Sequence, residues 1–479
     1  MSVRVLGVWI LVVSLLATPV WATCGGGGGG GTGGMGAGSS LSAQANVYQV
    51  PWTVLTTGKA VPADTRLTLY WFPASPEEAR ASALQKSRAL TLASARCVGM
   101  GLVPADHHEL YARFSATGQT PLVVLTGADG VELGRVAGAG KEPGVATVEK
   151  LVTNQLEARE EALEGQLDAA KAKEKAGDSA GAISLYREVW AQRCLVPSAG
   201  KKAAKALKKL GQPVDEKESA RLERVPSLDG RRSAELERVM DAGVAAENAA
   251  QYDQAQRLYQ RAHELDPADP VPLRYLAELE RHHTGEWRAA EGHFRALLSR
   301  PADPISRAVA LHGLGKMTLH ADRFPEGLAM LEESVATFPL PIAYRNLAVY
   351  WFSEGAQGKA LDYAQQALAL GPDDPYNQVF LAVFAADAGR REEALAAAHA
   401  HENLLEASYN LAVIHSLSGD NEKALALLKR HFYEYERYDA VRAMEMQEAR
   451  EDAGFARLHQ DPRFIALTAK ADGAHPAMR

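Results

Sequence analysis

The chain has few cysteines, few aromatic side chains and no excess of positive charge. Three cysteines among 479 residues cannot staple a small disulfide scaffold or supply the four thiolates of an all-cysteine zinc site. Lys and Arg number 52 against 59 Asp and Glu, which argues against nucleic acid as the main partner. Aromatic residues make up only 7 % of a chain that is 47 % hydrophobic, and alanine is abundant. The composition therefore favours a globular, helix-rich protein of about three domains.

Motifs that carry common catalytic chemistry are also absent from the sequence. It contains no Gly-x-Ser-x-Gly, His-Glu-x-x-His or Walker sequence, and the glycine run Gly25–Gly31 precedes any strand. The pairs His107–His108 and His282–His283 are poorly placed to share one metal, because adjacent side chains diverge by about 100° on a helix. We expect solvated or helix-capping histidines there. The sequence predicts no enzyme activity, no cofactor and no metal, and leaves open only a non-standard role for Cys97.

The N-terminus has the pattern of a secretory signal. Arg4 precedes the apolar run Val5–Leu16, which is shorter than the roughly 20 apolar residues that a transmembrane helix needs. Val20 and Ala22 suit the −3 and −1 positions of a cleavage site after Ala22. We therefore predict a signal peptide over residues 1–22, with an uncleaved anchor as the alternative.

Cys24 follows this cleavage site and begins a glycine-rich, flexible linker that we predict over residues 23–44. Its position resembles that of the lipidated cysteine of bacterial lipoproteins, although Trp21 and Thr23 depart from the usual lipobox. Lipidation of Cys24 is the alternative to simple cleavage after Ala22. In either case we expect an exported bacterial protein, periplasmic or secreted. It would be bound to the membrane only if Cys24 is lipidated or the signal is retained.

Residues 45–155 alternate between β-rich runs and helical stretches. An Asp-Gly pair, Asp129–Gly130, marks a tight turn between the last two strands. The expected strands are 67–72, 97–103, 122–125 and 131–136. The expected helices are 77–92, 105–115 and a helix from 147 onward. The order β-α-β-α-β-β-α predicts a small α/β domain.

This order resembles the thioredoxin fold, on the strength of Gln119–Pro121 before the third strand and of Gly134–Gly138 after the Asp-Gly turn. The resemblance implies that Pro121 is the cis-proline of the family. Where the family carries Cys-x-x-Cys, the chain has Phe72–Glu78, which contains no cysteine. Cys97 would lie at the second strand, away from the usual nucleophile. The usual thiol–disulfide exchange is therefore excluded, and the edge beside Pro121 would at most contact an extended peptide.

Cys97 and Cys194 remain once Cys24 is set aside. They would be able to pair in an oxidising compartment, but only if their Cα atoms approach within about 7 Å. Because they fall in different predicted domains, we expect two separate buried thiols that act as small hydrophobic side chains. The sequence leaves the pairing itself undecided.

From about residue 160 the sequence becomes a series of helices with small residues at fixed offsets. The same spacing relates two sets of residues: Ala255, Tyr259, Ala262 and Pro267, and Ala360, Ala364, Ala367 and Pro372. With its period of 34 residues, the pattern resembles the tetratricopeptide repeat. The resemblance implies about seven helix pairs, one near 163–196 and six in 233–479, stacked as a right-handed superhelix. The segment 455–464 resembles the terminal helix that caps such arrays.

The segment between these regions, residues 156–232, is predicted to be a helical connector that contains one repeat-like unit. Its part 197–232 is locally basic and includes Lys201, Lys202 and Lys205. Contact with an anionic lipid or an acidic partner is one interpretation. We favour a solvated helix face.

The predicted fold class is therefore mainly α, a tetratricopeptide solenoid preceded by a small α/β, thioredoxin-like domain. The resemblance implies a non-catalytic scaffold that binds a protein or peptide in the concave groove. Arg345, Asn346, Tyr409 and Asn410 fall at corresponding positions of first helices, where peptide-binding members hold backbone or carboxylate groups. A packing role for these asparagines is equally open. The alternative functions are a degenerate thiol–disulfide oxidoreductase-like protein and a lipid-anchored envelope-assembly component.

Overall fold

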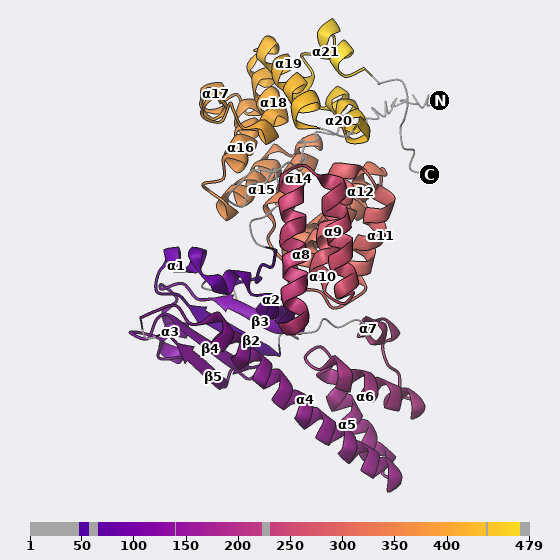
Figure 1. The fold of residues 1–479 in the computed structure, drawn as a ribbon. Helices are drawn as coiled ribbons and strands as arrows, with labels where there is room; N and C mark the ends of the chain where they lie inside the picture. Colours follow the sequence, from indigo (N-terminus) through magenta and orange to yellow (C-terminus); the bar gives the residue numbers. More distant parts are fainter. Residues whose placement is uncertain (1–46, 57–65, 139, 223–229, 437–438, 470–479) are drawn as a thin grey trace, which may run out of the picture.

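The computed structural model describes residues 47–56, 66–138, 140–222, 230–436 and 439–469. The predicted signal peptide, the glycine-rich linker and Cys24 lie outside these residues. The chain forms an α/β part, indigo in Figure 1, followed by a connector and a long array of helix pairs. In the described part of the chain, no helix combines the length and the apolar character needed to cross a membrane.

A five-stranded sheet forms the centre of the α/β part. Strand β2 lies in the middle, parallel to β3 and antiparallel to β4, and the strand order is β1-β3-β2-β4-β5. The four predicted strands are present, and the short strand β1 was not predicted. The strands are β1 (Thr53–Val54), β2 (Leu67–Phe72), β3 (Val98–Leu102), β4 (Leu122–Gly127) and β5 (Glu132–Ala137).

Helices cover both faces of this sheet. Leu69 and Trp71 of β2 belong to the core that includes α2 and α4, whereas Phe72 packs with Phe114, at the end of α3, on the other face. This alternation follows from the two-residue period of a strand. The three helices are α2 (Arg88–Ser94), α3 (His108–Arg113) and α4 (Val145–Lys175).

The single helix expected over 77–92 is wrong. The segment forms α1 (Pro76–Ala81), the 3-10 turn η1 (Ala83–Lys86) and α2. Ser82 and Ser87 interrupt it, because each hydroxyl accepts a backbone N–H of the turn that follows, at 3.0 Å in both cases. Serine side chains compete in this way with helix continuation.

Helix α4 passes without a break through residue 155, where we expected a domain boundary. It has 31 residues and runs from the sheet into the connector (Figure 1). Val148 and Val152 pack with the sheet, and Leu163 and Leu167 continue the same hydrophobic core among the connector helices. The α/β part and the connector therefore share one core. The connector helices are α5 (Ser179–Ala191), α6 (Pro197–Lys209) and α7 (Glu216–Arg221).

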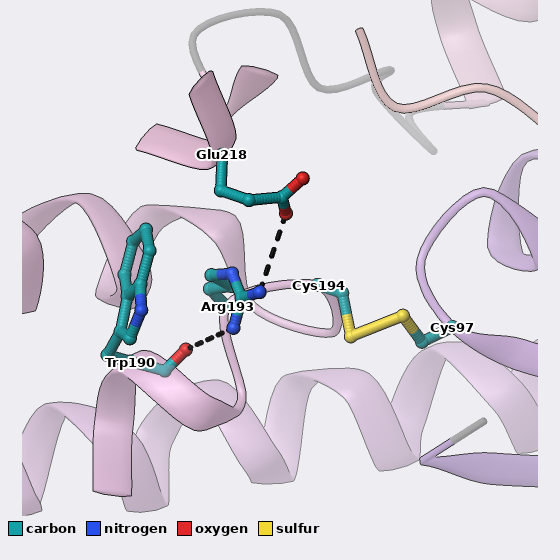
Figure 2. Close-up of a disulfide and its surroundings, with 5 residues drawn as sticks. All are labelled: Cys97, Trp190, Arg193, Cys194 and Glu218. Atoms are coloured by element: carbon teal, nitrogen blue, oxygen red, sulfur yellow. Dashed lines mark hydrogen bonds and ion pairs between the residues drawn. A yellow bond between two sulfur atoms is a disulfide. The ribbon is translucent and has the colours of Figure 1, made fainter. Parts of the chain in front are cut away.

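A disulfide joins Cys97 to Cys194, so the expectation of two separate thiols is wrong (Figure 2). Cys97 immediately precedes β3, and Cys194 lies in the turn between α5 and α6; their Cα atoms are 5.8 Å apart. The shared core brings these segments together, although 97 positions separate them in the chain. The neighbouring Arg193 donates hydrogen bonds to Glu218 of α7 and to the carbonyl oxygen of Trp190.

Beyond residue 230 the described chain folds into six consecutive helix pairs, in agreement with the repeat pattern. Pro270 and Pro304 each begin the first helix of a pair and are 34 residues apart, as are Pro341 and Pro375. The pairs are α8 (Gly230–Asn248) with α9 (Tyr252–Leu265), α10 (Pro270–Leu279) with α11 (Trp287–Leu298), α12 (Pro304–His320) with α13 (Phe324–Thr337), α14 (Pro341–Ser353) with α15 (Gln357–Leu370), α16 (Pro375–Asp387) with α17 (Arg391–Ala400), and α18 (Ser408–Ser418) with α19 (Asn421–Arg430).

Small residues allow the two helices of a pair to approach closely. The clearest case is the α12–α13 pair, where Gly315 and Gly327 face each other. A Cβ atom on Gly327 would lie 2.9 Å from the carbonyl oxygen of Gly315 and 2.6 Å from Cγ of Leu319. Any side chain at position 327 must therefore push the two helices apart.

Replacing Gly327 by valine is expected to lower the free energy of unfolding of the array by about 1–3 kcal/mol, the cost of overpacking a close helix contact. The matched control is Gly292→Val in α11, because a Cβ there meets no atom within 4 Å. Urea unfolding followed by circular dichroism measures both. Equal losses for the two variants would contradict the role of the close contact.

The α/β part contacts the array through a buried group of charges. Arg88, at the start of α2, lies 3.0 Å from Asp269 and 3.2 Å from Asp266, in the turn between α9 and α10. Tyr48 donates its hydroxyl proton to Asp269 at 2.8 Å. All four side chains are buried, so they join the two parts of the chain away from solvent.

The C-terminal segment differs from the single helix expected over 455–464. After α19 the chain forms the π-turn η4 (His431–Tyr435), α20 (Asp439–Glu451), the 3-10 turn η5 (Ala453–Phe455) and α21 (Pro462–Leu467). The last helix begins only at Pro462, because Asp461 caps it. Phe455 and Phe464 are nevertheless buried in the core that contains α18.

Candidate functional site

We call the face formed by the first helices α10, α12, α14 and α16, with the π-turn η2 (Glu280–Thr284) after α10, the inner face of the array. It carries a pocket. Its free interior volume is about 10 Å³, room for about one water molecule, and it is partly open to solvent. His312 and Lys316 lie one turn apart on α12, and Ile342, Arg345 and Asn346 share one face of α14. The full lining is Arg281, His282, His312, Lys316, Ile342, Arg345, Asn346 and Tyr376.

At one end of the pocket, Arg281 is buried against Glu278. Its Nη2 lies 3.3 Å from Oε2 of Glu278, and His282 Nε2 lies 3.2 Å from the same oxygen. Burial alone would raise the pKa of Glu278, but Arg281 and His282 outweigh it and hold this pKa below its usual range. Burial, followed by the charge of Arg281, lowers the pKa of His282 to about 4. At neutral pH the group is therefore an Arg–carboxylate pair beside a neutral imidazole.

At the centre of the pocket, His312 accepts a hydrogen bond from Asn346. The Asn346 Nδ2 lies 2.6 Å from His312 Nε2, which has to be the unprotonated ring nitrogen for this bond. Burial and then Arg281 lower the pKa of His312 well below its ordinary value, so the ring is neutral at pH 7. The amide of Asn346 is thereby fixed in one orientation.

The far end of the pocket is built by Arg345. It is 4 % exposed, donates from Nη1 to Asn377 Oδ1 at 2.8 Å, and lies over the ring of Tyr376 at 5.0 Å from its centroid. Stacking and hydrogen bonding hold the guanidinium in place.

The chemistry of this lining suits an anionic group. Three cations, Arg281, Lys316 and Arg345, line the pocket, and no acidic side chain does so among the described residues. Two of them are arginines, whose planar donors match carboxylate or phosphate oxygens, and Arg281 already pairs in this way with Glu278. Among the described residues there is no cluster of three or more His, Cys, Asp or Glu side chains able to hold a metal.

The four residues predicted for the groove do not lie in one place. Arg345 and Asn346 line the pocket. Tyr409 and Asn410 of α18 are fully buried and do not belong to its lining. Neither amide atom of Asn410 has a hydrogen-bond partner among the described residues.

Tyr409 belongs instead to a buried polar contact near the C-terminus. Its hydroxyl donates to Asp452 Oδ2 at 2.9 Å, and the Gly454 N–H donates to Oδ1 at 2.7 Å. Burial nevertheless raises the pKa of Asp452 to about 7. The folded protein therefore keeps this carboxyl group protonated at pH values where an unfolded chain has lost the proton.

This raised pKa makes the wild type lose stability relative to Asp452→Asn as the pH rises. The contribution of Asp452 is fully present below its unfolded pKa, near 3.8, and is lost as the pH rises through about 7. From pH 5 to pH 7 the unfolding free energy of the wild type should fall by about 2 kcal/mol relative to the variant. Urea titrations of both proteins at the two pH values measure this difference. If the difference in unfolding free energy between the two proteins is the same at pH 5 and pH 7, the pKa of Asp452 is not raised by burial.

The remaining predicted residues occupy structural positions. The Thr120–Pro121 bond is cis and precedes β4. The expectation of solvated or capping histidines is wrong for His282 and His283, which are buried in η2; His283 stacks on Tyr252. Burial there follows from the packing of η2 against α9 and α11.

The lysines of α6 are largely engaged by acidic side chains of the connector. Lys202 pairs with Glu164 at 2.6 Å, and Lys209 pairs with Glu174 at 2.9 Å, both on α4. Lys208 pairs with Glu216 of α7. These contacts match the solvated helix face that we favoured for this segment.

Sequence reasoning did not find Arg281, His312, Lys316 or Tyr376 as pocket residues. Arg281 lies in a π-turn, which shifts side chains away from the regular helical register. His312 carried a findable signal, because it precedes Asn346 by 34 residues, one repeat.

Several solved repeat structures are similar to parts of the chain. The pilF protein of Pseudomonas aeruginosa is 16 % identical, over 45 % of this chain and 98 % of that chain, with a TM-score of 0.31. YrrB, described as a tetratricopeptide repeat protein with an unusual peptide-binding site, is 22 % identical over 36 % and 90 %, with a TM-score of 0.25. The TPR2AB domain of yeast Sti1, in a complex with pHSP90, is 16 % identical over 47 % and 98 %, with a TM-score of 0.21. No protein-family model matches the chain, and no curated protein matches it.

Proposed function

We propose that the protein is an exported, non-catalytic scaffold that binds a protein or peptide on the inner face of its helix array. The observation that carries this proposal is the cationic pocket. It gathers Arg281, Lys316 and Arg345 from three consecutive helix pairs onto one surface. Such a surface recognises a carboxylate or another anionic group of an extended or helical segment, while the neighbouring repeats contact the rest of it.

The disulfide supports the proposal that the protein is exported. A bond between Cys97 and Cys194 persists in an oxidising compartment, and the pattern of residues 1–22 is that of a secretory signal. The α/β part is a thioredoxin-like domain without redox activity. Its sheet order and the position of Pro121 before β4 support that family, while Phe72–Glu78 contains no cysteine and Cys97 is held in the disulfide.

The test is capture of a partner by the chain from Ser40 onward, immobilised and exposed to a native envelope extract, with mass spectrometry of the bound proteins. We expect a partner that is lost when Lys316→Ala and Asn346→Ala are combined. It should be retained by Arg390→Ala, whose side chain pairs with Glu393 at the exposed start of α17. A partner retained equally by both variants would show that the binding site lies outside the pocket. Capture of no partner at all would contradict the scaffold function.

A further inference from the structure

Helix α20 lies against the inner face of the array, beside the pocket. It contacts the π-turn η2 of the second pair and the π-turn η4 after the last pair, so it bridges repeats that are far apart in the chain. Figure 1 shows α20 between the last helices and the end of α12. Its Glu448 lies 3.4 Å from His320, one turn beyond Lys316 of the pocket. Part of the inner face is therefore covered by a segment of the same chain.

One face of α20 carries the contact. Glu445 and Glu448 stand three positions apart and are 4 % and 7 % exposed, and Met446 and Ala449 are buried beside them. Glu445 Oε2 lies 2.9 Å from Nε2 of His431 in η4. On the other side of the helix, Glu451 is exposed. The array thus binds α20 through two carboxylates, each facing a histidine, and a narrow apolar stripe.

We infer that α20 occupies a helix-binding surface of its own chain. When α20 leaves, the same surface binds an amphipathic helix of a partner that carries two carboxylates three positions apart. The inference rests on the proposed function, because it names the kind of segment that the scaffold binds. The charge pattern supports it: the acidic side of α20 lies next to a pocket lined by Arg281, Lys316 and Arg345. A longer partner helix would occupy the site of α20 and bring its anionic groups beside the cationic lining of the pocket.

A tethered helix competes strongly with a partner, because its effective concentration is in the millimolar range. A variant in which α20 is released should therefore bind a competing helix more tightly than the wild type does. The variant Glu445→Gln/Glu448→Gln removes both charges and keeps the shape of the helix. The matched control is Glu451→Gln, on the exposed side of α20. The probe is a fluorescent synthetic peptide with the sequence of residues 439–452, added to the full mature chain.

By fluorescence anisotropy we expect the peptide to bind the Glu445→Gln/Glu448→Gln protein at least tenfold more tightly than the wild type or Glu451→Gln. A peptide with both glutamates replaced by glutamine should lose this binding, and so should the released protein when His320→Ala is added. Equal binding of the peptide to all three proteins, or no binding to the released one, overturns the inference. If Lys316→Ala/Asn346→Ala still abolishes capture of a partner in that case, the proposed function stands without it.

Hydrogen exchange on the wild type provides the second measurement, independent of whether the released variant folds. An occupant that leaves its site opens without unfolding of the array. The amides of α20 should then exchange at least a hundredfold faster than those of α18. Equal protection of the two helices would show that α20 is a permanent part of the fold and would overturn the inference.

Discussion

Replacing Cys97 and Cys194 together by serine is expected to lower the free energy of unfolding of the α/β part and connector by about 4 kcal/mol. The bond closes a loop of 97 residues, and closure of a loop of about 100 residues restricts the unfolded chain by about 4.7 kcal/mol in the chain-entropy description. Disulfides typically contribute less than this limit, about 2–4 kcal/mol.

The effect should extend over the whole α/β part and connector, because both share one core. Urea unfolding followed by tryptophan fluorescence reports on this unit through Trp71, which is buried in that core, and Trp190, which packs against it, once Trp287 and Trp351 of the array are replaced by phenylalanine. Reductant added to the wild type should reproduce the loss seen in the double variant. Cys24→Ser is the control, because the disulfide does not involve Cys24. An unfolding transition unchanged by both treatments would show that the bond does not stabilise this unit.

The sequence predicted the helix pairs because their signal is local. Small residues such as Ala360 and Ala394 recur 34 positions apart, since each pair must pack closely on itself and on its neighbour. The strands of the α/β part were predictable for a similar reason, as apolar runs between turn residues. Within the α/β part, the strand β1 was missed, and the helix prediction failed at Ser82 and Ser87, where side-chain hydrogen bonds interrupt an apparently helical stretch.

The contacts that were missed join residues far apart in the sequence. Cys97 and Cys194 pair because α4 continues the sheet core into the connector, and no local pattern shows that a helix crosses a domain boundary. Of the four residues predicted for the groove, Arg345 and Asn346 line the pocket and Tyr409 and Asn410 are buried elsewhere, while a role of any of them in partner binding stays a prediction. Equivalent repeat positions have different surroundings near the end of the array, where the C-terminal segment covers α18.

The junction between the α/β part and the array is the other contact that the sequence did not reveal. The hydrogen bond from Arg88 to Asp269 joins residues 181 positions apart. The guanidinium Nε of Arg88 also lies 3.2 Å from the hydroxyl of Tyr48. Burial raises the pKa of Asp269, and the charge of Arg88 opposes that rise. Asp269 also accepts the N–H of Val271 and so caps α10. One carboxylate therefore serves both the helix start and the junction.

Arg88→Met is expected to destabilise the junction by about 3–5 kcal/mol, because it leaves the carboxylates of Asp266 and Asp269 buried without their cation. The double variant Arg88→Met/Asp269→Asn should recover a substantial part of this loss, since the amide oxygen still caps α10 and one buried charge is removed. Urea unfolding of both variants measures the energies, and small-angle scattering measures whether the two parts separate. If Arg88→Met unfolds like the wild type and keeps its dimensions, the ion cluster does not join the two parts. The contact must then rest on the apolar neighbours of Tyr48 in the array core and on the hydrogen bonds that Arg274 and Tyr275 donate to the carbonyl oxygen of Val47.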